Sequence, residues 1–475
     1  MKTLPMVQKP NTSLAMVGLL AFGVMAACAD ASDPAPASDV AVAGDTADTV
    51  AASDADAQVF EVEAPCDPNE RPVVFVHGLL GSGDTWANHA MRLSSNGYCP
   101  EHIVAFDWNT LDQAEDATTA RVAELDATID ATLAATGAAQ VDLVGHSAGG
   151  GLSYSYLADE ARATKVARYV HVGSFTNAEP AGPEGAVPML NLWSSADLVI
   201  EEKGDIEGAE NVDLVTDDHY AVATSEASFI ALYSFLHDGQ APEVTVPRPQ
   251  ETVEVSGKAL TFAENQLFDG AVRLDALDPE TGLVSENGFA EQQTLSIAED
   301  GSWGPIEVPR GLPLQFTADG SDPAMSDVTY VLAPQERTNP LVYVRAFPSA
   351  ASLVGLLIDA IPTSSDKAVV IFFCRDRAMV AGQDSLTLNG MELLTEAIAP
   401  VEQSTIAIFG YDGDGDGESS LKSEVLFESL PFLAGIDVSV PAGSGEVVEV
   451  VFNGQTYRAA SRASETEGPL VFVLE

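Results

Sequence analysis

The chain has 475 residues, 46% of them hydrophobic, and a formal net charge of −51. This length is enough for two or three domains with cores of their own. The negative charge excludes nucleic-acid binding, because a protein that sits on phosphates needs a basic face. A solvated acidic surface accounts for the charge, and a dedicated cationic partner is the alternative.

Residues 1–27 have the pattern of an export signal. Lys2 and Lys9 precede an apolar stretch at 14–27 that is too short to span a membrane comfortably as a helix. The stretch ends in VMAAC, which resembles a bacterial lipobox, and the resemblance implies that Cys28 is lipidated. We therefore expect an exported protein that a lipid anchor holds to the membrane of the bacterial cell envelope, at the outer membrane or cell surface. An ordinary cleaved signal with an incidental cysteine is the alternative.

The segment after this cysteine is predicted to be a disordered tether, over residues 28–65. Its run from 29 to 57 contains small, acidic and hydroxylated residues and no large side chain. Such a run buries too little surface to offset the entropy lost on ordering, and its acidic residues repel one another.

Between residues 71 and 239, apolar strand signals alternate with helical patterns. This alternation indicates βαβ units and a parallel sheet that is covered on both faces. Ligands in such sheets bind at the C-terminal ends of the strands. The predicted strands are 73–77, 103–108, 141–145, 169–174 and 189–194, and the predicted helices are 122–133 (with a stop at Gly137), 152–164 and 223–236.

Cys66 and Cys99 each stand just before one of these strand signals. If the two strands are parallel neighbours, their N-terminal ends lie close together, so we expect a disulfide between them in an exported protein. Cys374, in VVIFFC, is expected to be a buried small hydrophobe.

After about residue 244 the pattern changes to short alternating segments that are separated by Gly, Asp, Asn and Pro. This pattern predicts an all-β region that follows a catalytic domain at 66–244 in the sequence. Residues 245–347, with a glycine turn, the hairpin DGSW and the turn VPRG, resemble the carboxypeptidase-regulatory-like β-sandwich. We expect a second β-rich domain at 348–475, which is a candidate for handling lipid.

Ser147 stands in the run VDLVGHSAGGG, where a buried strand meets a helix. The glycines at 145 and 149 relieve crowding at such a sharp turn, which exposes the serine hydroxyl as a nucleophile. The adjacent His146 is not counted as the base. A tight turn that happens to carry a serine is the alternative.

A general base and an acid are expected downstream of Ser147, in the order Ser, acid, His. Of the histidines at a useful distance, His237 ends a helix, where the helix dipole favours it, whereas His219 lies in a polar loop and is the better base. Asp197 follows the last apolar strand signal, where a carboxylate can accept the ring N–H of the histidine. The aspartates at 217–218 are rivals, but they adjoin His219 and are expected to make loop hydrogen bonds.

The turn in FVHGLLG follows the first strand. Its backbone N–H at Leu79 can point into the site, and the N–H of Ala148, directly after the nucleophile, is the second candidate for an oxyanion hole. His77 is expected to be a structural residue of the turn.

Together, FVHGLLG, GHSAGG, WSSAD and a loop histidine resemble the α/β-hydrolase lipase family. A histidine 22 residues beyond the aspartate is similar to the small lid-less bacterial lipases. This resemblance implies an α/β-hydrolase fold with a mostly parallel sheet, the triad Ser147, Asp197 and His219, and oxyanion donors at Leu79 and Ala148. The β-rich region that follows is similar in layout to the Archaeoglobus-type lipase, whose C-terminal domain is implicated in handling lipid.

The predicted activity is that of a serine carboxylic-ester hydrolase, a lipase or esterase, which acts on ester or lipid substrates, requires no cofactor and is a monomer. No long apolar insertion interrupts the predicted core, so any lid is small or comes from the C-terminal region, and we expect an open site. Two alternatives to this activity are open. One is a surface lipoprotein that binds lipid or polymer through its β-domains, and the other is a polyester depolymerase or acyltransferase with the same triad.

The run YDGDGDGESS places Asp412, Asp414, Asp416 and Gly417 at positions 1, 3, 5 and 6 of a calcium-loop pattern. Ser423 occupies the twelfth position, and the surroundings are β-rich rather than helical. A structural Ca²⁺ is therefore one prediction, and an acidic turn is the alternative.

Overall fold

The computed structural model describes residues 65–112, 114, 116–267, 269–320, 327–428 and 430–475. The predicted signal, the lipidated Cys28 and nearly all of the tether lie outside this range. In the part of the chain described here, no helix combines the length and the apolar character needed to cross a membrane.

The first region is built on a six-stranded sheet, in the order β2-β1-β3-β4-β5-β6, and every neighbouring pair is parallel. The five predicted strands are all present. The sixth, β6, is an edge strand with the polar sequence ENVD and partly exposed side chains, so it carries no apolar signal. The strands are β1 (Val73–Val76), β2 (Ile103–Phe106), β3 (Val141–His146), β4 (Val166–Val172), β5 (Met189–Trp193) and β6 (Glu210–Asp213).

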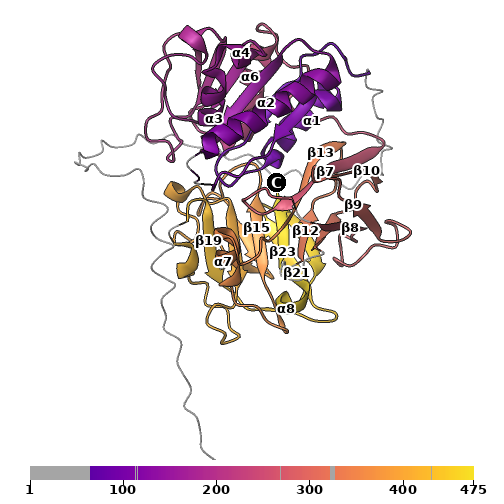
Figure 1. Cartoon of the computed structure of the whole chain (residues 1–475). Helices are drawn as coiled ribbons and strands as arrows, with labels where there is room; N and C mark the ends of the chain where they lie inside the picture. The colour runs from indigo at the N-terminus through magenta and orange to yellow at the C-terminus, as the bar shows by residue number, and fades with distance from the viewer. Residues whose placement is uncertain (1–64, 113, 115, 268, 321–326, 429) are drawn as a thin grey trace, which may run out of the picture. The chain divides into compact units, whose positions relative to one another are not determined.

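Both faces of this sheet are covered. Val73 and Phe75 of β1 belong to one buried cluster, whereas Val74 and Val76 belong to another. Since successive side chains of a strand point to opposite faces, the two clusters are the two sides of the sheet. Helices cover these faces (Figure 1), namely α1 (Ala87–Ser95), α2 (Ala117–Thr136), α3 (Ala148–Leu157), α4 (Glu160–Ala163), α5 (Ala221–Thr224) and α6 (Glu226–Leu236).

The helix ends follow local chemistry. α2 stops at Gly137, which is left-handed with φ 72° and donates its N–H to the Leu133 carbonyl, as a glycine cap does. The single helix predicted over 152–164 is instead two helices. Asp159 is extended, and its carboxylate accepts the N–H of Arg162, so a new helix begins there rather than the old one continuing.

The second region is mostly β, in keeping with the predicted fold class. Its largest sheet has eight strands, in the order β19-β18-β15-β23-β12-β11-β8-β9. The last strand of the chain, β23, lies between β12 and β15 and is parallel to both. Because β23 joins strands from 245–347 to strands from 348–475, the expected boundary at 347/348 falls inside one sheet rather than between two.

Smaller sheets complete the second region, with the orders β10-β7-β13, β17-β16-β21-β22 and β14-β20. The elements are β7 (Val253–Thr261), β8 (Gly270–Ala276), β9 (Gln293–Ser296), β10 (Ser302–Val308), β11 (Leu314–Gly320), β12 (Val328–Leu332), β13 (Asn339–Ala346), α7 (Leu353–Asp359), β14 (Lys367–Ala368), β15 (Val370–Cys374), β16 (Leu386–Leu388), β17 (Met391–Glu392), β18 (Ala407–Tyr411), β19 (Leu433–Asp437), β20 (Val440–Pro441), β21 (Val447–Phe452), β22 (Gln455–Ala460), α8 (Ser464–Glu467) and β23 (Leu470–Leu474).

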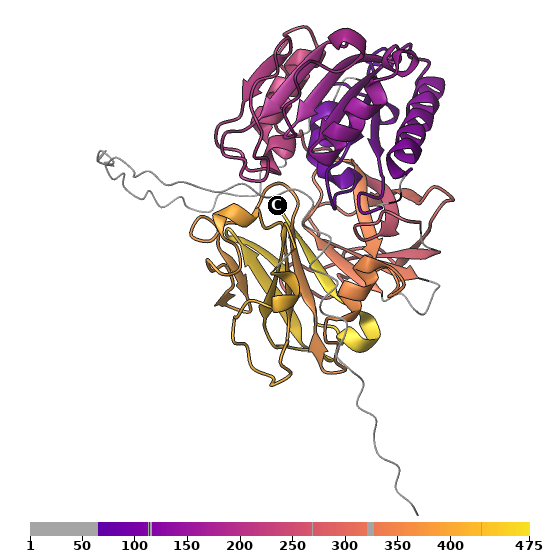
Figure 2. The ribbon, with the colours of Figure 1, turned by 60° about the vertical axis from the view of Figure 1, so that its left-hand side comes forward.

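The two regions are in direct contact, as Figure 2 also shows. β13 packs against α1. The buried guanidinium of Arg345 pairs with Asp84, and the Tyr343 hydroxyl donates to Asp107 Oδ2 at 2.8 Å. Polar side chains of the β-region therefore pack against the first region and form an ion pair and a hydrogen bond with it.

Cys66 and Cys99 form a disulfide, with their Cα atoms 4.9 Å apart. Both precede strands that pair in parallel, β1 and β2, as their positions in the sequence suggest. Cys374 is free and buried.

Candidate active site

Ser147, His219 and Asp197 form one continuous line of hydrogen bonds. The hydroxyl Oγ of Ser147 lies 3.0 Å from Nε2 of His219, and Nδ1 of His219 lies 2.8 Å from Oδ2 of Asp197. Since a carboxylate only accepts, the proton of the ring is on Nδ1, and Nε2 is left free to accept the serine proton. The histidine and the aspartate are buried, whereas Ser147 is half-buried.

Ser147 has a left-handed backbone, with φ 53° and ψ −121°, between the end of β3 and the start of α3. This conformation is costly for a residue with a side chain, and such strain is concentrated at functional sites. Its N–H donates to the Val172 carbonyl of β4 at 2.9 Å. The turn is therefore held by the neighbouring strand, with the side chain directed at His219.

Asp197 is held ionised by its surroundings. Burial alone raises the pKa of a carboxyl group, but hydrogen bonds from His219 and from the amides of Val199 and Ile200 outweigh it, so the pKa of Asp197 is lowered. The two amides bind Oδ1, which leaves Oδ2 to the histidine. An ionised Asp197 stabilises the imidazolium that forms when His219 takes a proton.

The turn with Leu79 lies directly against the nucleophile. A Cβ built on Gly78 would lie 3.0 Å from the Cβ of Ser147, so only a glycine allows this approach without a shift. Within the described residues, the N–H groups of Leu79 and Ala148 donate no hydrogen bond. Two unpaired amides therefore flank the serine, which is what a developing oxyanion needs.

The other histidines near the site are not bases. Nε2 of His146 is 2.9 Å from the His219 carbonyl and donates to it, and burial, helped by the charge of His219, lowers the pKa of His146 to about 3. His77 is buried in the turn, and its Nδ1 donates to the Gly78 carbonyl at 2.9 Å. His237 contacts Tyr98 and Tyr233 instead, away from Ser147.

The rival aspartates make loop hydrogen bonds. Oδ1 of Asp218 accepts the amides of Tyr220 and Ala221, and Oδ2 of Asp217 accepts the Ser225 hydroxyl. Neither carboxylate contacts the ring of His219, so Asp197 is the acid that the structure brings to the histidine.

Sequence reasoning missed two contributions of the β-region. Nδ2 of Asn265 donates to the carbonyls of Gly81 and Trp108, at 2.9 and 3.0 Å, and thereby braces the oxyanion turn. The ring of Phe432 lies parallel to the ring of His219. An asparagine at a turn or a phenylalanine beside a strand carries no sequence signal for either role.

Apolar side chains of the β-region lie beside the loop that carries His219. Tyr220, Ile406 and Phe432 form a buried apolar cluster, against which Leu80 packs. A cavity of about 40 Å³ adjoins this cluster and is lined largely by apolar side chains of the β-region. The predicted open site, with any lid small or supplied by the C-terminal region, stays a prediction.

The predicted calcium turn forms a different cluster from the one expected. Carboxylate oxygens of Asp412, Asp414 and Asp437 lie within 4.8 Å of one another, whereas Asp416 is not in the group and instead accepts the Glu418 amide. Asp437 also accepts the amides of Gly413 and Ser420. Calcium binding here stays a prediction.

Comparison with known proteins identifies the fold. A family model described as "alpha/beta hydrolase fold" matches residues 71–201, and a model described as a C-terminal domain matches residues 354–466. Among solved structures, a lipase from Bacillus licheniformis is 21% identical, with 37% of this chain and 95% of that chain covered and a TM-score of 0.30. An esterase from a Rhodococcus species is 16% identical, with 37% and 94% covered and a TM-score of 0.28. Residues 71–201 thus match the α/β-hydrolase fold, in agreement with the parallel sheet of the first region.

Proposed function

We propose that the protein is a serine carboxylic-ester hydrolase, a lipase or esterase that acts on acyl esters through an acyl-enzyme. The observation that carries this proposal is the hydrogen-bonded line from Asp197 through His219 to Ser147. It is supported by the two unpaired amides beside the serine, at Leu79 and Ala148.

The geometry suits two-step acyl transfer. His219 accepts the proton of Ser147 as the serine oxygen attacks the acyl carbonyl, and Asp197 stabilises the resulting imidazolium. The amides of Leu79 and Ala148 bind the tetrahedral oxyanion. The alcohol leaves with the proton from His219, and a water molecule, activated by the same histidine, then releases the acid.

The test is hydrolysis of a series of p-nitrophenyl esters of increasing chain length, together with labelling by a fluorophosphonate probe that reacts with activated serines. We expect hydrolysis of at least part of the series and stoichiometric labelling that Ser147→Ala abolishes. A folded wild type that neither hydrolyses any ester nor reacts with the probe would contradict the proposal and favour a lipid-binding or polymer-binding protein. Ester cleavage that proceeds only when a second alcohol is added would favour an acyltransferase.

We further propose that the enzyme acts in the bacterial envelope, anchored through a lipid on Cys28. The support is the sequence VMAAC and the acidic stretch that follows it. Metabolic labelling with an alkyne fatty acid is expected to modify the wild type and not Cys28→Ser. Equal labelling of the two proteins would contradict the anchor.

A further inference from the structure

The loop that carries His219 is held from the C-terminal β-region. This loop, residues 214–220, follows β6 and leads into α5. The ring of Phe432 lies parallel to the imidazole of His219, at an interplanar angle of 9° and a centroid distance of 5.9 Å. Tyr220, the next residue along the loop, packs in the same buried cluster as Ile406 and Phe432. The loop is thus in apolar contact with the β-region at two consecutive positions.

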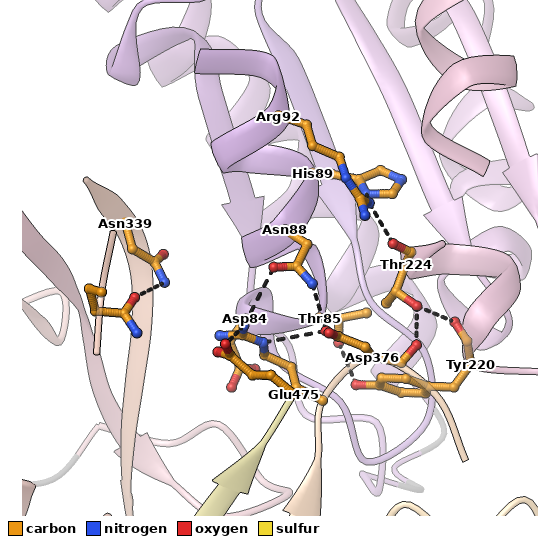
Figure 3. A network of polar contacts seen from close by, with 12 residues as sticks. Asp84, Thr85, Asn88, His89, Arg92, Tyr220, Thr224, Asn339, Asp376 and Glu475 are labelled. Atoms are coloured by element: carbon orange, nitrogen blue, oxygen red, sulfur yellow. Dashed lines mark hydrogen bonds and ion pairs between the residues drawn. The ribbon is translucent and has the colours of Figure 1, made fainter. Parts of the chain in front are cut away.

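Hydrogen bonds from a second segment, residues 376–378, hold this loop and the helix α5 that follows it. The amide of Ala378 donates to Oδ2 of Asp218 at 3.1 Å, and the hydroxyl of Thr224 donates to the carbonyl of Asp376. The carboxylate of Asp376 in turn accepts Nδ2 of Asn88 in α1 at 2.8 Å. Figure 3 shows Asp376 in contact with both Asn88 and Thr224. The segment therefore connects the histidine loop to α1 in the body of the hydrolase region, that is, the first region with the sheet β1 to β6 and its helices.

Phe432 is itself held in a conformation that its neighbours enforce. Its φ is 68°, in the left-handed region that costs a bulky residue about 1–2 kcal/mol. Its carbonyl accepts the amides of Ile406, at 2.8 Å, and Ala407, at 3.2 Å, and only 7% of the residue is exposed. Strain of this kind persists only where the surrounding structure determines it, and it is enriched at functional sites.

His219 needs such support because its two hydrogen bonds fix only the edges of the ring. The ring N–H and the ring lone pair that bond Asp197 and Ser147 are directed along the plane of an imidazole, so these bonds resist out-of-plane rotation weakly. Two neighbouring rings limit that rotation. His146 provides one, tilted by 40° at a centroid distance of 4.9 Å, and Phe432 provides another, parallel to the imidazole at 5.9 Å.

We propose that Phe432 is a positioning residue that holds the imidazole of His219 in line with Ser147, so that the C-terminal β-region completes the catalytic base of the hydrolase region. This inference rests on the proposed function. A misplacement of about 1 Å costs about 100-fold in rate, which sets the scale of the expected effect.

The test compares Phe432→Ala with Phe432→Tyr and with Phe452→Ala, a control for the loss of a buried phenylalanine. Phe452 is buried in β21 of the same region, so its truncation leaves a similar cavity. Steady-state rates on one short ester are divided by the number of sites that the fluorophosphonate labels at completion, which removes unfolded protein from the comparison.

Phe432→Ala is expected to lower kcat per labelled site by about 10- to 100-fold with KM within two-fold, because the base is misplaced while substrate contacts remain. Phe432→Tyr, which keeps the flat ring, is expected to restore kcat to within about three-fold, and Phe452→Ala to keep the wild-type kcat per site. Three results would overturn the inference alone: an unchanged kcat in Phe432→Ala, an effect confined to KM, or an equal loss in Phe452→Ala. A wild type that is inert to esters and probe would overturn the proposed function and this inference with it.

Discussion

Gly149 lies so close to His77 that a Cβ on Gly149 would be 2.5 Å from the carbonyl oxygen of His77. This contact brings the start of α3 onto the end of β1. The nucleophile turn and the oxyanion turn are therefore in close backbone contact at this point, and the spacing between Ser147 and the Leu79 amide depends on the absence of a side chain at position 149.

Gly149→Ala is expected to destabilise the protein by at least about 2 kcal/mol and to reduce activity, because the methyl group meets backbone that cannot move aside. Gly151→Ala is the matched control two residues along the same helix. A Cβ there meets nothing within 4 Å, and alanine in place of glycine stabilises a helix by about 1 kcal/mol. Thermal unfolding and ester hydrolysis of the two variants check the prediction. Equal behaviour of the two would show that close packing at 149 is unimportant.

Removing the hydroxyl of Ser147 should separate activity from stability. Ser147→Ala and Ser147→Gly are both expected to lose at least about 10³-fold in kcat. Because the backbone at 147 has φ 53°, which glycine adopts freely, Ser147→Gly should also be about 1 kcal/mol more stable than Ser147→Ala. Denaturant unfolding followed by circular dichroism measures the difference. Equal stability of the two variants would mean that the strain at this turn is negligible.

Asp197→Asn is expected to keep the fold and lose about 10³- to 10⁴-fold in kcat at neutral pH. An asparagine can still accept the amides of Val199 and Ile200 through its oxygen, but it then presents its NH₂ group to Nδ1 of His219. The histidine proton moves to Nε2, which can no longer accept the proton of Ser147. Rates measured at saturating ester should show this loss with little change in KM. A fall of less than ten-fold would assign the acid to another residue.

The buried histidines predict a loss of stability in mild acid. Burial lowers the pKa of His171 from 6.5 to about 4, because the charged ring is poorly solvated. A group with a depressed folded pKa contributes stability that is present above its unfolded pKa and is lost as the pH falls through the folded pKa. Between pH 6.5 and 4, His171 should therefore account for a loss of about 3 kcal/mol.

The variant His171→Gln tests this because its amide can still donate to the Phe175 carbonyl, which Nε2 of His171 contacts at 3.1 Å, but does not titrate. Its unfolding free energy should fall less steeply than that of the wild type between pH 6.5 and 4.5, as urea titrations at several pH values would show. Parallel curves for the two proteins would contradict the assignment.

Much of the hydrolase region could be predicted from the sequence. The central strands, such as VVFV in β1, are apolar throughout because helices cover both faces of a parallel sheet, and this leaves a continuous signal. The triad was predicted because serine, aspartate and histidine occupy strand ends and loops of a fold whose chain order is constrained. The polar edge strand β6 was missed because it lacks the apolar pattern on which strand prediction depends.

The sequence by itself therefore determined the sheet, the nucleophile turn and the identity of the acid and base, since each depends on local pattern and chain order. Only the tertiary structure decided how the β-region takes part. It showed that β23 joins the two expected β-domains into one sheet, that Asn265 braces the oxyanion turn, and that Phe432 lies on His219. These contacts link residues 100 or more positions apart, and the packing of two surfaces leaves no periodic pattern in the sequence of either one.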